Sequence, residues 1–380
     1  MLEFIKVLIV FLINLTICLT IYAVAYKINP YCQKSITTAG GTAIPNKRGY
    51  CSGELIFEEN FDRLNLNIWQ HQITLNREFQ WYTNNRSNTY SKNGKLHIRP
   101  TLTADIYGEE FLSSGTVDLR PDCTDWANDG CLRTGNTKNI INPVQSGRIR
   151  TINSFYYKYG RIEVSAKMPA GDWLFPAVWL MPKENLYGGW PMSGEIDLVE
   201  SRGNRIFKVG GKNIGTNQVG ITLHFGPDRS HDAWRTSHFE QNLPYGQGYD
   251  QKFHKYEMIW TPDYIQFKLD DKEIGLVETS DGFYKRGKFP NGTVNIWENG
   301  EKNAPFDREF YVIINLAIGG TSFFSDSGSN PGGKPWKNKS PYAITEFWNG
   351  RNQWLPTWDL YNNKNENPEL QVDYVRVYAL

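Results

Sequence analysis

Three carboxylates fall within six residues in the stretch Ser193–Ser201, which reads SGEIDLVES. Successive side chains of a β-strand point to opposite faces, so Glu195 and Asp197 share one face and the intervening apolar residues share the other. Glu200 is out of phase by one residue, and a β-bulge near Leu198–Val199 would bring it back beside the other two. The stretch therefore predicts a strand with an apolar core face and an acidic cleft face.

This spacing suits carbohydrate chemistry. Glu195 and Glu200, leaning inward across a bulge, would hold their carboxyl groups about 5–5.5 Å apart, the separation expected of a retaining glycosidase. One carboxylate would attack the anomeric carbon, and the other would protonate the leaving oxygen. The alternative is a solvated acidic strand face, because the pattern E-x-D-x-x-E is short.

Tryptophans lie close to the acidic stretch in the sequence. Sugar rings present apolar C–H faces, and flat aromatic side chains pack against apolar surfaces. Trp173, Trp179 and Trp190 are therefore predicted stacking platforms. Core packing is the alternative for Trp179.

The segment 221–225, which reads ITLHF, repeats the same alternation. Its apolar residues face the core, which sends Thr222 and His224 to the cleft. A histidine beside a carboxylate cluster can donate a hydrogen bond and orient an acid. The other histidines show no metal-binding spacing, and no G-x-S-x-G motif supports a serine nucleophile.

The composition narrows the class of protein. The 380 residues carry a net charge of only +1, which argues against a nucleic-acid binder with its basic surface. Glycine and aromatic residues are abundant, with 13 tryptophans, as suits an all-β protein with long loops. The length allows one large domain or two modest ones.

The first residues predict secretion. Lys6 precedes an apolar run, and Ala23–Ala25 fits a small-x-small cleavage site, so 1–25 is a predicted signal peptide. An uncleaved membrane anchor is the alternative. After cleavage we expect an extracellular protein without stable membrane association.

The cysteines agree with an oxidising compartment. Removal of the signal would leave an even number, namely Cys32, Cys51, Cys123 and Cys131. Four cysteines allow three pairings, of which we predict the nearest-neighbour one, Cys32 with Cys51 and Cys123 with Cys131. Glycosylation sequons occur at Asn85, Asn291 and Asn338.

The rest of the chain reads as strand after strand. Residues 26–50 form a predicted N-terminal arm, and 51–380 form one domain. Predicted strands cover 161–168, 256–260, 265–269, 310–318 and 371–378, and no long amphipathic helix stands out. The fold class is therefore all-β, a sandwich of two antiparallel sheets. Gly/Pro-rich loops at 187–191 and 330–339 are expected to rim a groove.

The stretch GEIDLVESRGN at 194–204 resembles the signature of family 16 glycoside hydrolases, and in particular the laminarinase branch of endo-β-1,3-glucanases. The resemblance extends to animal β-1,3-glucanases and to β-glucan recognition proteins, also called Gram-negative-bacteria-binding proteins. It covers most of the chain, through segments at 78–86, 158–161, 173–182, 304–320 and 371–378.

The resemblance implies a concave β-jelly roll with an open groove, so that 51–380 would be the catalytic domain. It makes Glu195 the nucleophile, Glu200 the acid/base and Asp197 their assistant. An ionised Glu195 would keep Glu200 protonated, and esterification of Glu195 would let Glu200 act as base.

The resemblance also implies binding residues. Asn84, Asn85 and Arg86 would hold sugar hydroxyls, which argues against glycosylation of Asn85, and Phe306 would contact substrate. Asp373 matches a position that helps bind a structural calcium in many relatives. No cofactor is required for the reaction, and a monomer is expected.

Three functions follow from the resemblance. The first is a secreted endo-β-1,3-glucanase acting on laminarin-like glucans through a glycosyl-enzyme. The second is a non-catalytic β-1,3-glucan recognition protein of innate immunity, and the third is an enzyme for another polysaccharide. Glu195 and Glu200 are both present, which favours the first. Only the short arm precedes Cys51, without the glucan-binding module that many recognition proteins carry.

Overall fold

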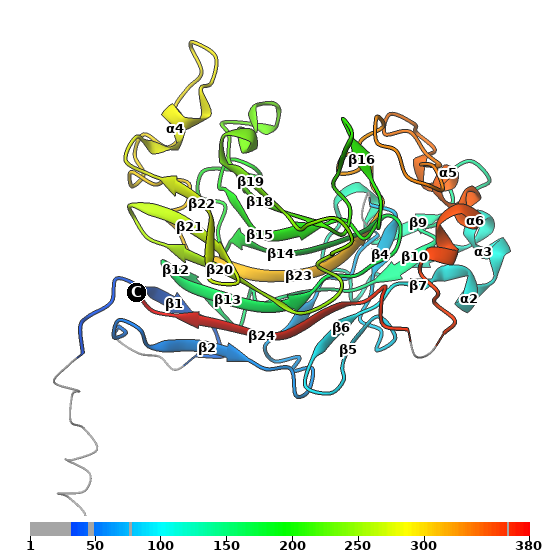
Figure 1. Cartoon of the computed structure of the whole chain (residues 1–380), viewed down its shortest axis with the longest axis horizontal. Coiled ribbons are helices and arrows are strands. Elements are labelled where there is room, and N and C mark those ends of the chain that lie inside the picture. The colour runs from blue at the N-terminus through cyan, green and yellow to red at the C-terminus, as the bar shows by residue number, and fades with distance from the viewer. Residues whose placement is uncertain (1–31, 45–48, 76–77, 363–364) are drawn as a thin grey trace, which may run out of the picture.

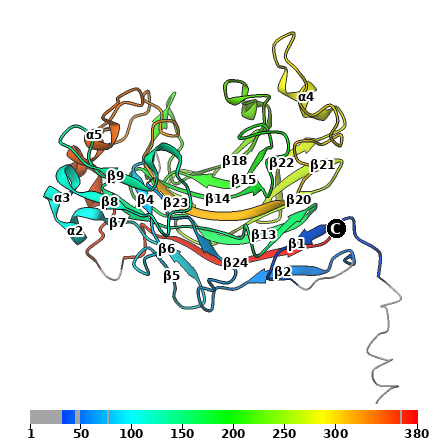
Figure 2. The same ribbon diagram turned by 180° about the vertical axis from the view of Figure 1, so that it is seen from behind.

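The computed structural model describes residues 32–44, 49–75, 78–362 and 365–380. Two large antiparallel sheets lie on one another and curve together, so that one sheet forms a concave layer and the other a convex layer (Figure 1). Loops rise on both sides of the concave layer, with α4 on one side and α5 on the other (Figures 1 and 2). The predicted all-β sandwich is therefore confirmed.

The concave sheet has nine strands. Its main order is β1-β12-β23-β14-β15-β18-β19, with β11 paired to β23 and β3 paired to β11. The bounds are β1 (Thr38–Gly40), β3 (Gln70–His71), β11 (Arg148–Arg150), β12 (Tyr156–Lys158), β14 (Leu174–Pro182), β15 (Glu195–Ser201), β18 (Gln218–His224), β19 (His238–Asn242) and β23 (Phe310–Ile318).

The convex sheet has eight strands. Its main order is β22-β21-β20-β13-β24-β6-β5, with β2 paired to β24. The bounds are β2 (Leu55–Glu59), β5 (Thr89–Ser91), β6 (Leu96–Ile98), β13 (Gly160–Lys167), β20 (His254–Trp260), β21 (Tyr264–Leu269), β22 (Lys272–Glu278) and β24 (Leu370–Tyr378).

Smaller elements fill the periphery. A three-stranded sheet contains β4 (Gln80–Tyr82), β7 (Thr101–Leu102) and β10 (Val144–Ser146), and its β4–β10 pair is parallel. Two two-stranded antiparallel sheets pair β8 (Thr116–Asp118) with β9 (Leu132–Thr134), and β16 (Lys208–Val209) with β17 (Lys212–Asn213). The helices are short: α2 (Thr103–Tyr107), α3 (Glu109–Ser114), α4 (Gly282–Gly287), α5 (Ala343–Asn349), α6 (Arg351–Trp354), η1 (Ala127–Asp129), η2 (Arg229–His231), η3 (Trp234–Ser237) and η4 (Leu355–Thr357).

Alternating sequences produce the core between the sheets. In β13, Ile162 and Val164 are wholly buried, and in β18 Val219 and Leu223 are too. Each such side chain contributes about 1.5–3 kcal/mol to folding when it leaves water. The apolar run of β23 is buried along all nine residues, as the sequence predicts for a strand covered on both faces.

The N-terminal arm is tied to the sheets from residue 32 onward. Cys32 pairs with Cys51 and Cys123 pairs with Cys131, which confirms the nearest-neighbour prediction. The arm then adds β1 to the concave sheet beside β12.

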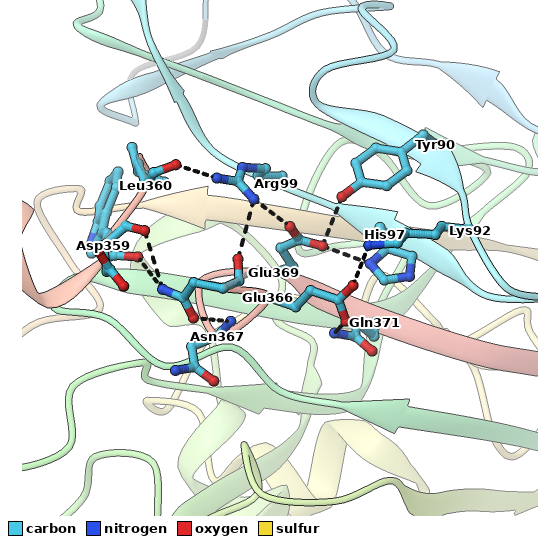
Figure 3. A network of polar contacts seen from close by, with 12 residues as sticks. Tyr90, Lys92, His97, Arg99, Asp359, Leu360, Glu366, Asn367, Glu369 and Gln371 are labelled. Carbon is cyan, nitrogen blue, oxygen red and sulfur yellow. Dashed lines mark hydrogen bonds and ion pairs between the residues drawn. The ribbon is translucent and has the colours of Figure 1, made fainter. Parts of the chain in front are cut away.

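A buried polar network fixes the chain that leads into β24 (Figure 3). The Glu369 carboxylate accepts hydrogen bonds from His97 Nδ1 at 2.6 Å, Arg99 Nη1 at 2.8 Å and the Tyr90 hydroxyl at 2.9 Å. His97 and Tyr90 lie on β6 and β5, so the network ties the residue just before β24 to two strands of the convex sheet.

The predicted signal peptide, 1–25, lies outside the described residues. Within the part of the chain that the structure describes, no helix is both long and apolar enough to cross a membrane.

Candidate active site

Strand register places the sequence-predicted carboxylates in rows across the concave sheet. One row runs from Arg148 through Asn315 and Ala177 to Glu200, and then over Gly220 to Glu240 on β19. A second row contains Trp179, Asp197, Thr222 and His238, and Glu195 lies opposite His224. Residues directly opposite each other share a face, so these side chains form the floor of one cleft.

A bulge in β15 makes these rows possible. Asp197 pairs with Thr222 and Glu200 with Gly220, so β15 uses three steps where β18 uses two. The extra residue falls at Leu198–Val199, and both of these side chains are buried in the core. The predicted bulge is therefore confirmed, and it turns Glu200 to the same face as Glu195 and Asp197.

Polar contacts join the members of the cluster. His224 Nδ1 forms a hydrogen bond with Asp232 Oδ2 at 2.6 Å, and its Nε2 lies 3.3 Å from Asp197 Oδ2, an ion-pair distance. The indole N–H of Trp190 donates to Glu195 Oε2. His224 thus faces the cleft beside the acids, as the alternation of β18 predicts.

The environment favours protonated acids. Burial, together with the neighbouring Asp197, raises the pKa of Glu195, and burial together with Glu200 raises the pKa of Asp197. Two adjacent carboxylates beside one imidazole resist double ionisation, so the pair retains a proton near neutral pH. Burial opposes the charge on His224, but its hydrogen bonds to Asp197 and Asp232 outweigh burial and raise the His224 pKa to about 12.

Glu200 has the properties of a general acid. Burial raises its pKa to about 7, with Glu195 adding to the effect while His224 and a hydrogen bond from Thr222 oppose it. A carboxyl group whose pKa lies near the working pH can both give and accept a proton.

A cleft of about 480 Å³ opens over Glu200 and His224. Its aromatic lining comes from Phe175, Trp190, Trp234 and Phe323. Phe175 and Phe323 stack on one another with centroids 3.6 Å apart, and the Arg202 guanidinium lies 3.9 Å from the Phe323 ring centroid. Flat apolar faces beside charged groups suit a ligand with C–H faces and hydroxyls.

Two of the predicted platforms lie at the site. Trp190 lines the cleft. Trp179 is half-buried on the cleft face, its N–H donates to Asn315 Oδ1 at 2.6 Å, and Arg148 lies 5.4 Å from its ring centroid. Trp179 is therefore held in place by polar partners on the neighbouring strands.

The prediction for Trp173 is wrong. Its side chain is wholly buried, and edge-to-face contacts with Phe207, Phe324 and Trp336 surround it. The backbone at this residue has a positive φ of 70°. Trp173 is a core residue and cannot stack on a sugar.

The prediction for Phe306 is also wrong. The side chain is wholly buried, packs on Phe283, and lies beneath Gly194, where an added Cβ would come within 2.9 Å of its ring. Phe306 supports the start of β15 from the core side and does not face the cleft.

Asn84, Asn85 and Arg86 form a separate exposed turn after β4. Arg86 donates to the Asn84 carbonyl at 2.9 Å and lies 3.4 Å from His71 Nε2. None of the three lines the cleft over Glu200. Their role in sugar binding stays a prediction.

One cluster in the described residues has ligand atoms close enough for a shared cation. Glu195, Asp197 and His224 hold such atoms within 4.8 Å of one another. Both ring nitrogens of His224 already face carboxylates, so the arrangement is a hydrogen-bonded cluster and we assign it no metal. Asp373 is the extra residue of a bulge in β24, and a calcium site there stays a prediction.

Sequence patterns did not reveal several cleft residues. They include Phe175, Arg202, Asp232, Trp234, His238, Glu240 and Phe323. Phe175 and Arg202 lie within the segments 173–182 and 194–204 that carry the family resemblance, but Asp232 and Trp234 lie in a loop without periodicity. Thr222 faces the cleft as the alternation of 221–225 predicts, and His238 lies opposite it on β19.

Comparison with known proteins agrees with this site. The family model described as Glycosyl hydrolases family 16 matches residues 76–308. A Beta-1,3-glucan-binding protein of Penaeus monodon is 45% identical over 338 residues, which cover 86% of this chain and 90% of that protein. Beta-1,3-glucan-binding protein 1 of Galleria mellonella is 34% identical, and the match covers 87% of this chain but only 64% of that protein.

Solved structures share the fold. The laminarinase catalytic domain from Thermotoga maritima MSB8 matches with a TM-score of 0.52 at 21% identity, covering 87% of this chain and 99% of that one. The endo-beta-1,3-glucanase from Pyrococcus furiosus matches with a TM-score of 0.53 at 20% identity, covering 86% and 94%. At these identities the likeness concerns the jelly-roll fold alone.

Proposed function

Because this chain belongs to glycosyl hydrolase family 16, we propose that its concave cleft binds a β-1,3-glucan and hydrolyses internal bonds with retention of configuration. The observation that carries the proposal is the bulge that turns Glu200 to the face of Glu195 and Asp197. Two carboxylates at one cleft, with different environments, are the minimum that a retaining mechanism requires.

In this proposal Glu200 acts first as an acid. Its pKa of about 7 keeps much of it protonated at neutral pH, so it can protonate the leaving glycosidic oxygen. Glu195, in its ionised form, attacks the anomeric carbon from the other side as the bond to the leaving oxygen breaks, and forms a glycosyl ester. The ester carries no charge, so Glu200 then ionises readily and activates water.

The second candidate is glucan recognition without hydrolysis. The names of the relatives favour it, since the proteins of Penaeus monodon and Galleria mellonella are both called beta-1,3-glucan-binding proteins. Binding in the same cleft is common to both candidates. The three buried carboxylates favour hydrolysis over recognition alone, because binding a neutral glucan does not require several acids at one site.

Secretion belongs to the same proposal. The two disulfides support it, since disulfides persist in oxidising compartments and are rare in the cytosol.

The test uses purified protein, laminarin and two assays. Affinity is measured by calorimetry, and hydrolysis by release of reducing ends, for wild type and for Glu195→Gln. We expect the wild type to bind and cleave laminarin, and Glu195→Gln to bind it without cleavage. Binding without cleavage by the wild type would instead identify a recognition protein. Failure to bind laminarin, with cleavage of another polysaccharide, would overturn the glucan assignment.

A further inference from the structure

We propose that Asp232 is a positioning residue that keeps the His224 ring charged and thereby sets how tightly the Glu195–Asp197 pair holds its shared proton. This inference rests on the proposed function for its kinetic consequence. Its structural part concerns only the charge state of the His224 imidazole ring.

The ring of His224 is held from both sides. Its Nε2 faces Asp197 Oδ2 at 3.3 Å, and its Nδ1 faces Asp232 Oδ2 at 2.6 Å. Ionised carboxylates only accept hydrogen bonds, and a neutral imidazole has a single N–H. A ring protonated on both nitrogens, and therefore positively charged, donates to Asp232 through Nδ1 and faces Asp197 with its second N–H, so the placement between two acids favours the charged form of His224.

Asp232 reaches this position from a different element. It lies in the loop that follows β18, after η2, and its side chain is only 12% exposed. The loop is pinned because the Ala233 N–H donates to the Phe225 carbonyl at 2.8 Å. Gly226 permits the close turn, since an added Cβ would lie 2.2 Å from the His231 carbonyl oxygen.

The groups that face His224 are mostly acidic. Asp197, Glu195 and Asp232 act on it directly, and its charge also acts on Glu200 and on His238 of β19. A positive ring beside Asp197 favours ionisation of the Glu195–Asp197 pair. If His224 became neutral, the pair would bind its protons more tightly, and the nucleophile would ionise only at higher pH.

The same loop contains a matched control. Asp228 forms an equivalent pair with His231, with Oδ2 and Nδ1 2.8 Å apart, but both side chains are exposed and neither lines the cleft. Asp228→Asn therefore disturbs an Asp–His pair in this loop without touching the acids.

The first measurement is a proton–nitrogen NMR titration of the His224 ring in wild type, Asp232→Asn and Asp228→Asn. We expect a doubly protonated ring at pH 7 in the wild type and in Asp228→Asn. In Asp232→Asn the asparagine amide can donate to Nδ1, so we expect a neutral ring at pH 7 with its proton on Nε2. A ring already neutral in the wild type, or unchanged in Asp232→Asn, would overturn the proposal.

The second measurement is the pH profile of kcat/KM on laminarin. In Asp232→Asn both limbs should move to higher pH, the acid limb by about one unit and the alkaline limb by less. A purely structural role would lower the rate at every pH without moving the limbs, and this result would contradict the proposal. If the wild type proves inactive, the proposed hydrolysis fails, but the NMR titration still decides whether Asp232 sets the state of His224.

Discussion

Two buried clusters of histidine and carboxylate lie in opposite sheets of this protein, and they are built by opposite rules. In the convex sheet, the Glu369 carboxylate has three donors of its own, from His97, Arg99 and Tyr90, and the nearby Glu366 has Lys92 as its partner. Burial opposes its charge, but these hydrogen bonds outweigh burial and lower the Glu369 pKa. Its negative charge is fully matched, and the cluster holds strands together.

In the concave sheet the carboxylates outnumber the charged donors. Glu195, Asp197 and Glu200 crowd around one imidazole, and burial with mutual repulsion raises the pKa of each acid. The same residue types thus give a carboxylate with enough hydrogen-bond donors in the convex sheet, and carboxylates with too few donors in the concave sheet. The comparison teaches that the ratio of donors to carboxylates, more than the residue types, separates a structural cluster from a chemical one.

The largest expected effect concerns hydrolysis. Glu195→Gln should reduce laminarin cleavage roughly 10⁴-fold or more, because an amide cannot form the glycosyl ester. Glu369→Gln should leave kcat within about two-fold of wild type. Reducing-end assays on both variants provide the measurement, and equal losses in the two would show that the clusters do not differ in kind.

The next effect concerns stability. Glu369→Gln should lower the free energy of unfolding by about 3 kcal/mol at pH 7, since it leaves buried donors without their anion. A carboxyl group with a lowered pKa stabilises the fold above its unfolded pKa, and this contribution is lost as pH falls through the folded value. The deficit should therefore shrink below about pH 4, near the ordinary glutamate value. Denaturant titrations across pH measure it, and a deficit that is constant with pH would contradict the assignment.

Glu195→Gln should change the free energy of unfolding in the opposite direction and stabilise the fold. Burial and Asp197 raise the Glu195 pKa from 4.5 to about 8, so the folded protein binds a proton more tightly than the unfolded chain. Stability then declines as pH rises from about 4.5 to about 8. The glutamine removes this decline, so we expect the variant to gain about 1–2 kcal/mol at pH 8 and little at pH 4. A destabilised Glu195→Gln variant at pH 8 would mean that its acid is as well satisfied as Glu369.

The smallest effect concerns glucan affinity. Trp234→Ala removes a cleft-lining aromatic ring and should weaken laminarin binding about ten-fold, with little change in melting temperature. Glu369→Gln should lower the melting temperature and leave affinity unchanged. Calorimetry on laminarin separates the two, and loss of affinity in Glu369→Gln would mean that the convex network also shapes the cleft.

Local patterns predicted the parts of this molecule that depend on neighbours along the chain. The alternation of β15 fails at one residue, and that failure alone predicted the bulge at Leu198–Val199. The strands β13, β20, β21, β23 and β24 follow their apolar periodicity closely. The nearest-neighbour disulfides are also local features.

Other features depend on partners distant in sequence, and no pattern revealed them. Trp173 follows a glycine and an aspartate as a loop residue would, yet Phe207, Phe324 and Trp336 enclose it from three distant segments. Asp232 gains its role from a backbone hydrogen bond that returns its loop to the end of β18. Such placements follow from tertiary packing, which a single sequence does not display.

The central claim is that the bulge in β15 brings Glu200 beside Glu195, so that one acid protonates the leaving oxygen while the other attacks the sugar. Proton NMR during the first minutes of laminarin cleavage tests this claim most directly, because it identifies the anomer before mutarotation. Two successive inversions through a glycosyl-enzyme should give the β-anomer first. An α-anomer appearing first would require a water between more distant carboxylates and would contradict the account, and so would the absence of any new reducing end.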